Sequence, residues 1–175
     1  KYVILNLKIG VDSIFFKIIR QMATVLANSN PNFANGFHVM AKPAGPTCNL
    51  ACRYCFYLEK NLLYPDHPDK RMTLEVLESY LRQYIESQPT PEINFAWQGG
   101  EPTLLGLEFF KTAVALQQKY ANGKRITNAI QTNGILIDEP WAGFLHEHEF
   151  LVGLSLDGPR EFHDTFRRDK ADRPT

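Results

Sequence analysis

Three cysteines lie within eight residues, at Cys48, Cys52 and Cys55, and the 175-residue chain contains no other cysteine. Thiolates are ligands of soft metals, and an iron–sulfur cluster is normally held by four of them. An odd number of cysteines packed this closely argues against a disulfide scaffold and indicates a reducing compartment. The spacing therefore predicts a four-iron cluster on three thiolates, with one iron free to bind another molecule.

A zinc site is the main alternative for the same cysteines, with His38 or His67 as a fourth ligand. Structural zinc sites usually contain two Cys-x2-Cys pairs, whereas this chain has one such pair, Cys52 and Cys55. Chance placement of three cysteines in a core is also disfavoured, because the segment is rich in turn-forming residues. The pattern thus favours iron–sulfur over zinc.

The cysteine loop must be positioned by regular elements, and these are expected after residue 36. Four apolar runs predict strands, at 37–41, 93–97, 126–131 and 150–156, and helices are expected from Thr73, over 107–121 and from Asp138. This alternation indicates an α/β fold with a parallel sheet and helices outside it. The run 150–156 is almost continuously apolar, which is typical of a strand covered on both faces.

The unusual polar residues follow the ends of these strands. In barrels of β/α units, active sites lie on the loops after the carboxyl ends of the strands, and the cysteine loop follows the first predicted strand. The later loops contribute Gln98, Gly99, Gly100 and Glu101 after the second strand, Gln131-Thr132-Asn133-Gly134 after the third, and Ser155 and Asp157 at the fourth. Each motif alone reads as an ordinary turn or a hydrogen-bonded structural group, but together they predict one functional rim.

Composition excludes some classes of function. The net charge is zero and 44% of residues are apolar, so a core is expected and nucleic-acid binding is not. Charges interrupt the apolar residues 2–27, which makes a membrane span or a signal peptide a poor interpretation. The odd number of clustered cysteines favours the reducing cytoplasm. Residues 1–35 are expected to be an extension, an amphipathic helix over 13–27 and a linker, before a domain over 36–175. The chain starts at Lys1 and ends at Thr175 without a closing element, which predicts a piece of a longer protein.

The amino-acid sequences of these motifs resemble those of a known family. Cys48-x3-Cys52-x2-Cys55 followed by Gly99-Gly100-Glu101-Pro102 resembles the radical S-adenosylmethionine (radical SAM) enzymes. Five longer stretches that include or accompany these motifs look like the anaerobic sulfatase-maturating enzymes: residues 37–43, 55–60, 97–104, 131–134 and 153–159. The resemblance runs from about Phe37 to the end, and it implies about four of the six β/α units of a radical SAM barrel.

The resemblance implies a function and a set of site residues. Cys48, Cys52 and Cys55 would hold a [4Fe-4S] cluster whose open iron binds S-adenosylmethionine. The residues expected to contact that cofactor are Tyr54, Tyr57, Gln98, Gly99, Gly100, Glu101, Ser155 and Asp157. The implied reaction is oxidation of a cysteine or serine in a sulfatase polypeptide to Cα-formylglycine, with electrons from a donor such as flavodoxin or ferredoxin.

Several points stay open from the sequence. The family places its catalytic base and two auxiliary clusters in a later part, so no catalytic residue is assigned here and this piece alone is expected to be inactive. A related radical enzyme that modifies another peptide, for example by thioether crosslinking, would share the same motifs. A non-enzymatic zinc, iron–sulfur or electron-transfer module is the third interpretation. The sequence does not distinguish a cysteine-type from a serine-type substrate.

Overall fold

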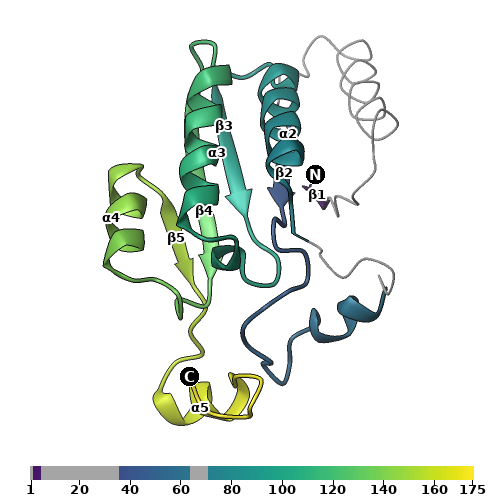
Figure 1. Ribbon diagram of the computed structural model, residues 1–175, viewed down its shortest axis with the longest axis vertical. Coiled ribbons are helices and arrows are strands. Elements are labelled where there is room, and N and C mark those ends of the chain that lie inside the picture. Colours follow the sequence, from purple (N-terminus) through teal and green to yellow (C-terminus); the bar gives the residue numbers. More distant parts are fainter. Residues whose placement is uncertain (1, 5–35, 64–70) are drawn as a thin grey trace.

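The computed structural model describes residues 2–4, 36–63 and 71–175, which form a parallel sheet with its strands in the order β1-β2-β3-β4-β5 (Figure 1). The elements in chain order are β1 (Tyr2–Ile4), β2 (His38–Ala41), η1 (Leu58–Leu63), α2 (Leu74–Ser87), β3 (Glu92–Trp97), η2 (Pro102–Leu105), α3 (Leu107–Tyr120), β4 (Arg125–Thr132), α4 (Glu139–Glu147), β5 (Leu151–Leu154) and α5 (Arg160–Phe166). The helix expected over 13–27 lies outside the described residues.

The four predicted strands are confirmed as β2 to β5, and they alternate with α2, α3 and α4. The sheet also contains β1, in the segment that the sequence assigned to a helical extension. β1 pairs in parallel with β2, with Tyr2 opposite His38. The sequence did not predict this additional short edge strand, because its apolar residues 2–4 were read as part of a longer apolar stretch.

Local signals placed the helix ends correctly. The Thr73 side chain accepts a hydrogen bond from the Val76 backbone N–H at 3.3 Å, and this caps the start of α2. Asp138 caps α4 in the same way, by accepting from the Trp141 backbone N–H at 3.0 Å. Both caps satisfy a backbone donor that the first helical turn leaves without a partner.

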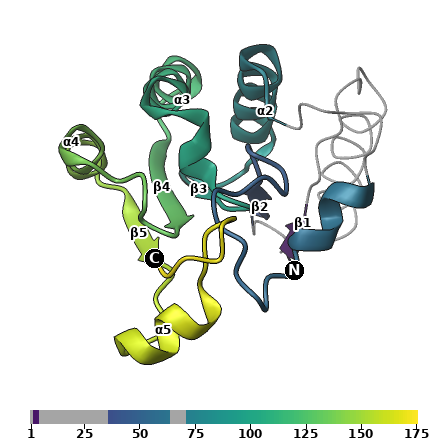
Figure 2. The same cartoon turned by 60° about the horizontal axis from the view of Figure 1, so that its bottom comes forward.

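The core lies between the sheet and the helices α2, α3 and α4, which share one side of it (Figure 2). Alternate residues of β3, namely Ile93, Phe95 and Trp97, are buried on that side. Trp97 meets Phe110 of α3 edge to face, with ring centroids 5.6 Å apart. The apolar spacing of each helix thus finds an apolar strand face, and this packing fixes the sheet beneath the loops that follow it.

β5 departs from its expected environment. The sequence predicted a strand covered on both faces, but β5 is an edge strand paired only with β4. Leu151 is 73% exposed, and Leu154 and Leu156 also face solvent. For the described residues, the prediction that both faces of this strand are buried was therefore wrong. An apolar sequence shows that a strand can be buried, but it does not show whether another element packs against it.

After β5 the chain continues past the carboxyl ends of the strands, where α5 and the residues after it lie (Figure 1). Two backbone hydrogen bonds join this segment to the cysteine loop, from Ala51 N–H to the Arg168 carbonyl at 2.8 Å and from Arg53 N–H to the Phe166 carbonyl at 2.9 Å. α5 was not predicted. Within the described part of the chain, no helix has the length and apolar character needed to cross a bilayer.

Candidate functional site

The loops after the strands meet as the sequence predicted, and backbone hydrogen bonds join them. The loop after β3 donates to the loop after β2 from Gly100 N–H to the Gly45 carbonyl at 2.9 Å, and from Glu101 N–H to the Thr47 carbonyl at 2.8 Å. The Ser155 N–H donates to the Thr132 carbonyl at 2.9 Å, which extends the pairing of β4 with β5. The cysteine loop is thereby held by the element next to it.

The two glycines make this contact sterically possible. A Cβ atom on Gly100 would lie 2.0 Å from the Thr47 carbonyl oxygen, and one on Gly99 would lie 2.9 Å from the Gly45 carbonyl oxygen. Gly99 also has a φ of +127°, which side-chain-bearing residues rarely adopt. The resemblance implied that the glycine pair contacts the cofactor. Its visible role is the close packing of two loops, and its contact with a ligand stays a prediction.

The three cysteines are free thiols on one loop. Cys52 is buried, while Cys48 and Cys55 are half-buried. Burial is the main reason that the pKa values of Cys48 and Cys52 lie above that of an ordinary thiol, and repulsion from the neighbouring thiols adds to it. A metal centre would remove both penalties, because a coordinated thiol is deprotonated by the cation itself.

The described residues do not form a ready site for a single metal ion. Among the described residues, no three His, Cys, Asp or Glu side chains are arranged to hold one metal ion. The ligands of an iron–sulfur cluster bind different irons, so they are spaced more widely than those of zinc. The structure thus gives the zinc alternative no support through His38, which begins β2, and His67 lies outside the described residues.

Glu101 joins the loops after β3 and β4. It is 1% exposed, and its carboxylate accepts hydrogen bonds from Thr103 N–H at 3.1 Å, Thr103 Oγ1 at 2.6 Å, Thr132 Oγ1 at 2.8 Å and Asn133 N–H at 2.8 Å. A buried carboxylate is costly unless it is hydrogen-bonded in this way. Sequence reasoning named Glu101 as a cofactor contact and missed this structural role.

Asn133 continues the connection to the cysteines. Its Nδ2 donates to Asn49 Oδ1 at 2.8 Å and lies 3.7 Å from Cys48 Sγ. The Leu50 backbone N–H also donates to Cys48 Sγ, at 3.3 Å. The sequence placed Asn133 on the predicted rim but gave it no role at the cofactor or the cysteines. Its place in the Thr-Asn-Gly stretch at the end of a strand was the signal that could have identified it.

Tyr54 and Asp157 are in direct contact, which the sequence did not predict. The Tyr54 hydroxyl donates to Asp157 Oδ2 at 2.6 Å, and Arg167 donates to Asp157 Oδ1 at 3.1 Å while its guanidinium lies 5.6 Å from the centroid of the Tyr54 ring. Burial first, and then the bond to Asp157, raises the pKa of Tyr54 to about 12. Sequence reasoning missed Arg167, which completes this group on the C-terminal segment.

The other predicted residues lie on the same loops and make fewer contacts with the rest of the site. Tyr57 is buried, with the Lys42 ammonium 5.0 Å from its ring centroid. Ser155 Oγ accepts a hydrogen bond from Gln131 Nε2 at 2.9 Å. Gln98 donates its backbone N–H to the Ala41 carbonyl at 2.9 Å. The structure therefore places all the predicted residues on loops at the carboxyl end of the sheet.

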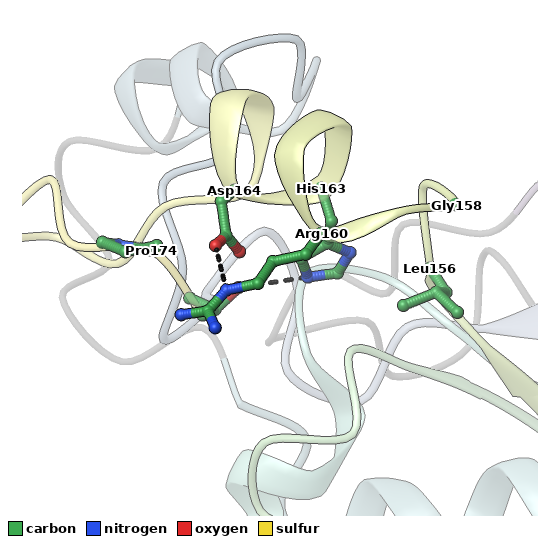
Figure 3. A pocket seen from close by; sticks show the side chains of 7 residues that line it. Leu156, Gly158, Arg160, His163, Asp164 and Pro174 are labelled. Atoms are coloured by element: carbon green, nitrogen blue, oxygen red, sulfur yellow. Dashed lines mark hydrogen bonds and ion pairs between the residues drawn. The ribbon is translucent and has the colours of Figure 1, made fainter.

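A shallow pocket of about 400 Å³ lies next to Asp157, between the end of β5 and α5 (Figure 3). Leu156 and Gly158 flank Asp157 at its edge. Inside it, Arg160 pairs with Asp164 at 3.0 Å, and His163 contacts Thr175 through Nε2 at 3.3 Å. These polar groups already have partners within the chain.

Comparison with known proteins agrees with the site. The sequence profile of the Radical SAM superfamily matches residues 43–174. The serine-type anaerobic sulfatase-maturating enzyme of Bacteroides thetaiotaomicron is 49% identical over 143 residues, which are 82% of this chain and 34% of that protein. The cysteine-type enzyme of Clostridium perfringens (strain ATCC 13124) is 50% identical over 135 residues, which are 75% of this chain and 35% of that protein.

Solved structures give the same result. Native anSMEcpe with bound AdoMet and the Cp18Cys peptide superposes with a TM-score of 0.68 at 47% identity, over 77% of this chain and 35% of that one. The same protein with AdoMet alone gives a TM-score of 0.69. The chain spans about a third of the length of the curated relatives that it matches. With its three-cysteine loop, its parallel α/β sheet and these matches, the chain belongs to the radical SAM superfamily and is homologous to the anaerobic sulfatase-maturating enzymes.

Proposed function

We propose that this chain is the part of a radical SAM enzyme that binds its [4Fe-4S] cluster and S-adenosylmethionine, and that the whole protein oxidises a cysteine or serine of a sulfatase to Cα-formylglycine. The observation that carries the proposal is the loop of Cys48, Cys52 and Cys55, hydrogen-bonded to the Gly-Gly-Glu loop beside it. The similarity to both types of sulfatase-maturating enzyme supports the choice of substrate.

The proposed cofactor chemistry needs little from the protein except placement. When bound, such a cluster supplies the electron that cleaves the sulfonium of S-adenosylmethionine to a carbon radical, which is chemistry of the cofactors themselves. Cys48, Cys52 and Cys55 would hold three irons. Cys52 is buried while Cys48 and Cys55 are half-buried, and the hydrogen bond from Gly100 N–H to the Gly45 carbonyl helps to hold their loop in place.

We assign the cofactor contacts to the groups expected from the sequence. Gln98, Ser155 and the backbone of Gly99 and Gly100 would contact the methionine part of the cofactor or its ribose. Glu101 has four donors on its carboxylate, so a contact of Glu101 with the methionine would use its backbone. Tyr54, Tyr57 and Asp157 would contact the adenosine, and here the bond between Tyr54 and Asp157 joins two of them.

The remaining parts of the proposal concern the whole protein. The sheet would be part of a barrel of six β/α units, with further units beyond β5. The general base would lie outside this chain, so residues 1–175 alone would not convert substrate. An electron donor such as flavodoxin or ferredoxin would reduce the cluster, and free cysteines with an oxygen-sensitive centre are suited to the cytoplasm.

The test uses the full-length protein, loaded with iron and sulfide without oxygen and given S-adenosylmethionine, a reductant and sulfatase peptides that contain cysteine or serine. Mass spectrometry should show the aldehyde in at least one peptide, together with 5′-deoxyadenosine. If 5′-deoxyadenosine forms and neither peptide changes, the substrate assignment is wrong and another peptide is modified. If no iron binds, the interpretation as a radical enzyme fails.

A further inference from the structure

The amide of Asn133 points at Cys48 in a fixed orientation. Its Oδ1 accepts a hydrogen bond from the Ile135 backbone N–H at 3.0 Å. Because a backbone N–H can only donate, this bond identifies the other end of the amide as the NH2 group. That group faces Asn49 Oδ1 at 2.8 Å and Cys48 Sγ at 3.7 Å. The side chain therefore presents N–H donors, and not an oxygen, to the sulfur.

Buried neighbours hold the Asn133 backbone. Its N–H donates to Glu101 Oε2 at 2.8 Å, and Glu101 is also bonded to Thr132 Oγ1 at 2.8 Å. The Gly134 N–H then donates to the same threonine hydroxyl at 3.0 Å, with Gly134 at a φ of +79° that suits glycine. The tight turn after β4 is thus anchored to a buried carboxylate, and Asn133 has little freedom to move away from Cys48.

The sulfur of Cys48 changes its hydrogen bonding when it binds metal. As a free thiol it donates toward Asn49 Oδ1, at 3.6 Å. As a thiolate it has no proton and can only accept, and two N–H groups are in place for that, from Leu50 at 3.3 Å and from Asn133 at 3.7 Å. Hydrogen bonds to charged acceptors are stronger than those to neutral ones. The Asn133 contact should therefore strengthen in the metal-bound state.

We propose that Asn133 is a positioning residue that donates an N–H···S hydrogen bond to the Cys48 thiolate and raises the reduction potential of the bound cluster. Hydrogen bonds to the sulfurs are among the features that set cluster potentials. The reduced cluster carries one more negative charge than the oxidised cluster, so a donor favours the reduced form. The inference rests on the proposed cluster at Cys48, Cys52 and Cys55.

The test compares midpoint potentials of variants of this chain after anaerobic loading. Because the chain has three cysteines in total, the signal comes from one cluster. Asn133→Ser keeps an oxygen that can accept from Ile135 N–H but is too short to reach the sulfur. The matched control is Asn94→Ser, which removes the amide bonded to Thr127 Oγ1 at 3.1 Å. A redox titration followed by electron paramagnetic resonance gives the potential, and iron analysis gives the loading.

We expect Asn133→Ser to shift the potential to a more negative value at unchanged iron content, and Asn94→Ser to leave it unchanged. A purely structural role would lower thermal stability or iron content and leave the potential of loaded chains the same, and that result overturns the inference. Wild-type chain that binds no iron overturns the proposed function as well, which separates the two failures.

If Asn133→Ser fails to bind iron, a measurement on the unaltered chain tests the hydrogen bond between Asn133 and Cys48. Side-chain ¹⁵N-labelled asparagine should give a hyperfine coupling to the unpaired electron of the reduced cluster, because an N–H···S bond transfers spin density to the donor. The Asn94→Ser chain should show the same coupling as wild type. A reduced cluster without any ¹⁵N coupling contradicts the hydrogen bond.

Discussion

Glu101 places a carboxylate where water cannot reach it, and the surrounding residues supply all its hydrogen bonds. Three donors converge on Oε1 and the Asn133 N–H meets Oε2. A glutamine at this position keeps one oxygen for the three donors and turns an NH2 group toward the Asn133 N–H. Two donors then face each other in a buried site, which leaves both unsatisfied.

We expect Glu101→Gln to lower the free energy of unfolding by about 1–3 kcal/mol, which is the usual cost of an unsatisfied buried donor. Denaturant unfolding of the two chains measures this difference. The control is Glu108→Gln, which removes an exposed ion pair with Lys111 at 2.7 Å and should change stability by less than about 0.5 kcal/mol. Equal effects of the two substitutions would show that Glu101 does not hold the loops together.

Asp157 should make stability depend on pH in one direction. Burial alone would raise the pKa of this carboxyl, but hydrogen bonds from Tyr54 and Arg167 hold it below the ordinary value. A carboxyl with a lower pKa in the folded state stabilises the fold above its unfolded pKa of about 3.9, and this contribution disappears as pH falls through the folded pKa.

The free energies of unfolding of the wild type and of Asp157→Asn should therefore differ by a constant amount near neutral pH. The difference should shrink once pH falls below about 4, because the wild-type carboxylate then becomes protonated. Unfolding titrations of both chains at a series of pH values measure it. A difference that stays constant down to the most acidic buffers would mean that Asp157 has no ionised partnership with Arg167.

At the scale of elements, the contact between the loops after β2 and β3 depends on Gly100. A methyl group there would overlap the Thr47 carbonyl oxygen, at a distance of 2.0 Å. Because the obstacle is backbone, Gly100→Ala must push the cysteine loop away. We expect a loss of about 1–3 kcal/mol of stability and a lower iron content after loading, measured by unfolding and by iron analysis.

Gly143 provides the matched control for that prediction. It lies inside α4, and a Cβ atom there meets no atom within 4 Å. Gly143→Ala should stabilise the chain by about 0.5–1 kcal/mol, because alanine is the better helix former, and should leave iron content unchanged. Loss of iron in both variants would point to a general effect on the fold and would contradict the specific role of Gly100.

The elements were predictable from the sequence to the extent that local chemistry determines them. Thr73 and Asp138 predict helix starts because the side chain of a capping residue bonds to a backbone N–H only three residues further along the chain. The convergence of strand-end loops follows from parallel topology alone. The short strand β1 and the helix α5 were missed, since neither has enough residues for a clear period.

The side-chain partners within the site could not be predicted, because they are distant in sequence. Tyr54 and Asp157 are 103 positions apart, and Cys48 and Asn133 are 85 apart. Motifs place such residues on the same rim but do not say which atoms meet. Glu101 illustrates the difference: the motif identified it as important, and the structure shows four donors on its carboxylate.

At the scale of the whole molecule, β5 pairs with β4 alone among the described residues, and this leaves an apolar edge open. An edge strand with unpaired backbone groups and apolar side chains is a template for association with another chain. We expect the 175-residue chain to self-associate as its concentration rises, in sedimentation or light scattering. Leu151→Lys, at a site that is 73% exposed, should reduce association and change the free energy of unfolding by less than about 0.5 kcal/mol. A chain that stays monomeric at every concentration would contradict this expectation.

The interpretation of the whole molecule depends on a metal centre held by one loop. Its most direct test is the iron and sulfide content and the visible spectrum of the chain after loading without oxygen. We predict about four irons and four sulfides per chain, a brown colour, and loss of both iron and colour when Cys48, Cys52 or Cys55 is changed singly to alanine. Chains that bind no iron under any loading condition, or a single-cysteine variant that keeps full iron and an unchanged spectrum, would contradict it.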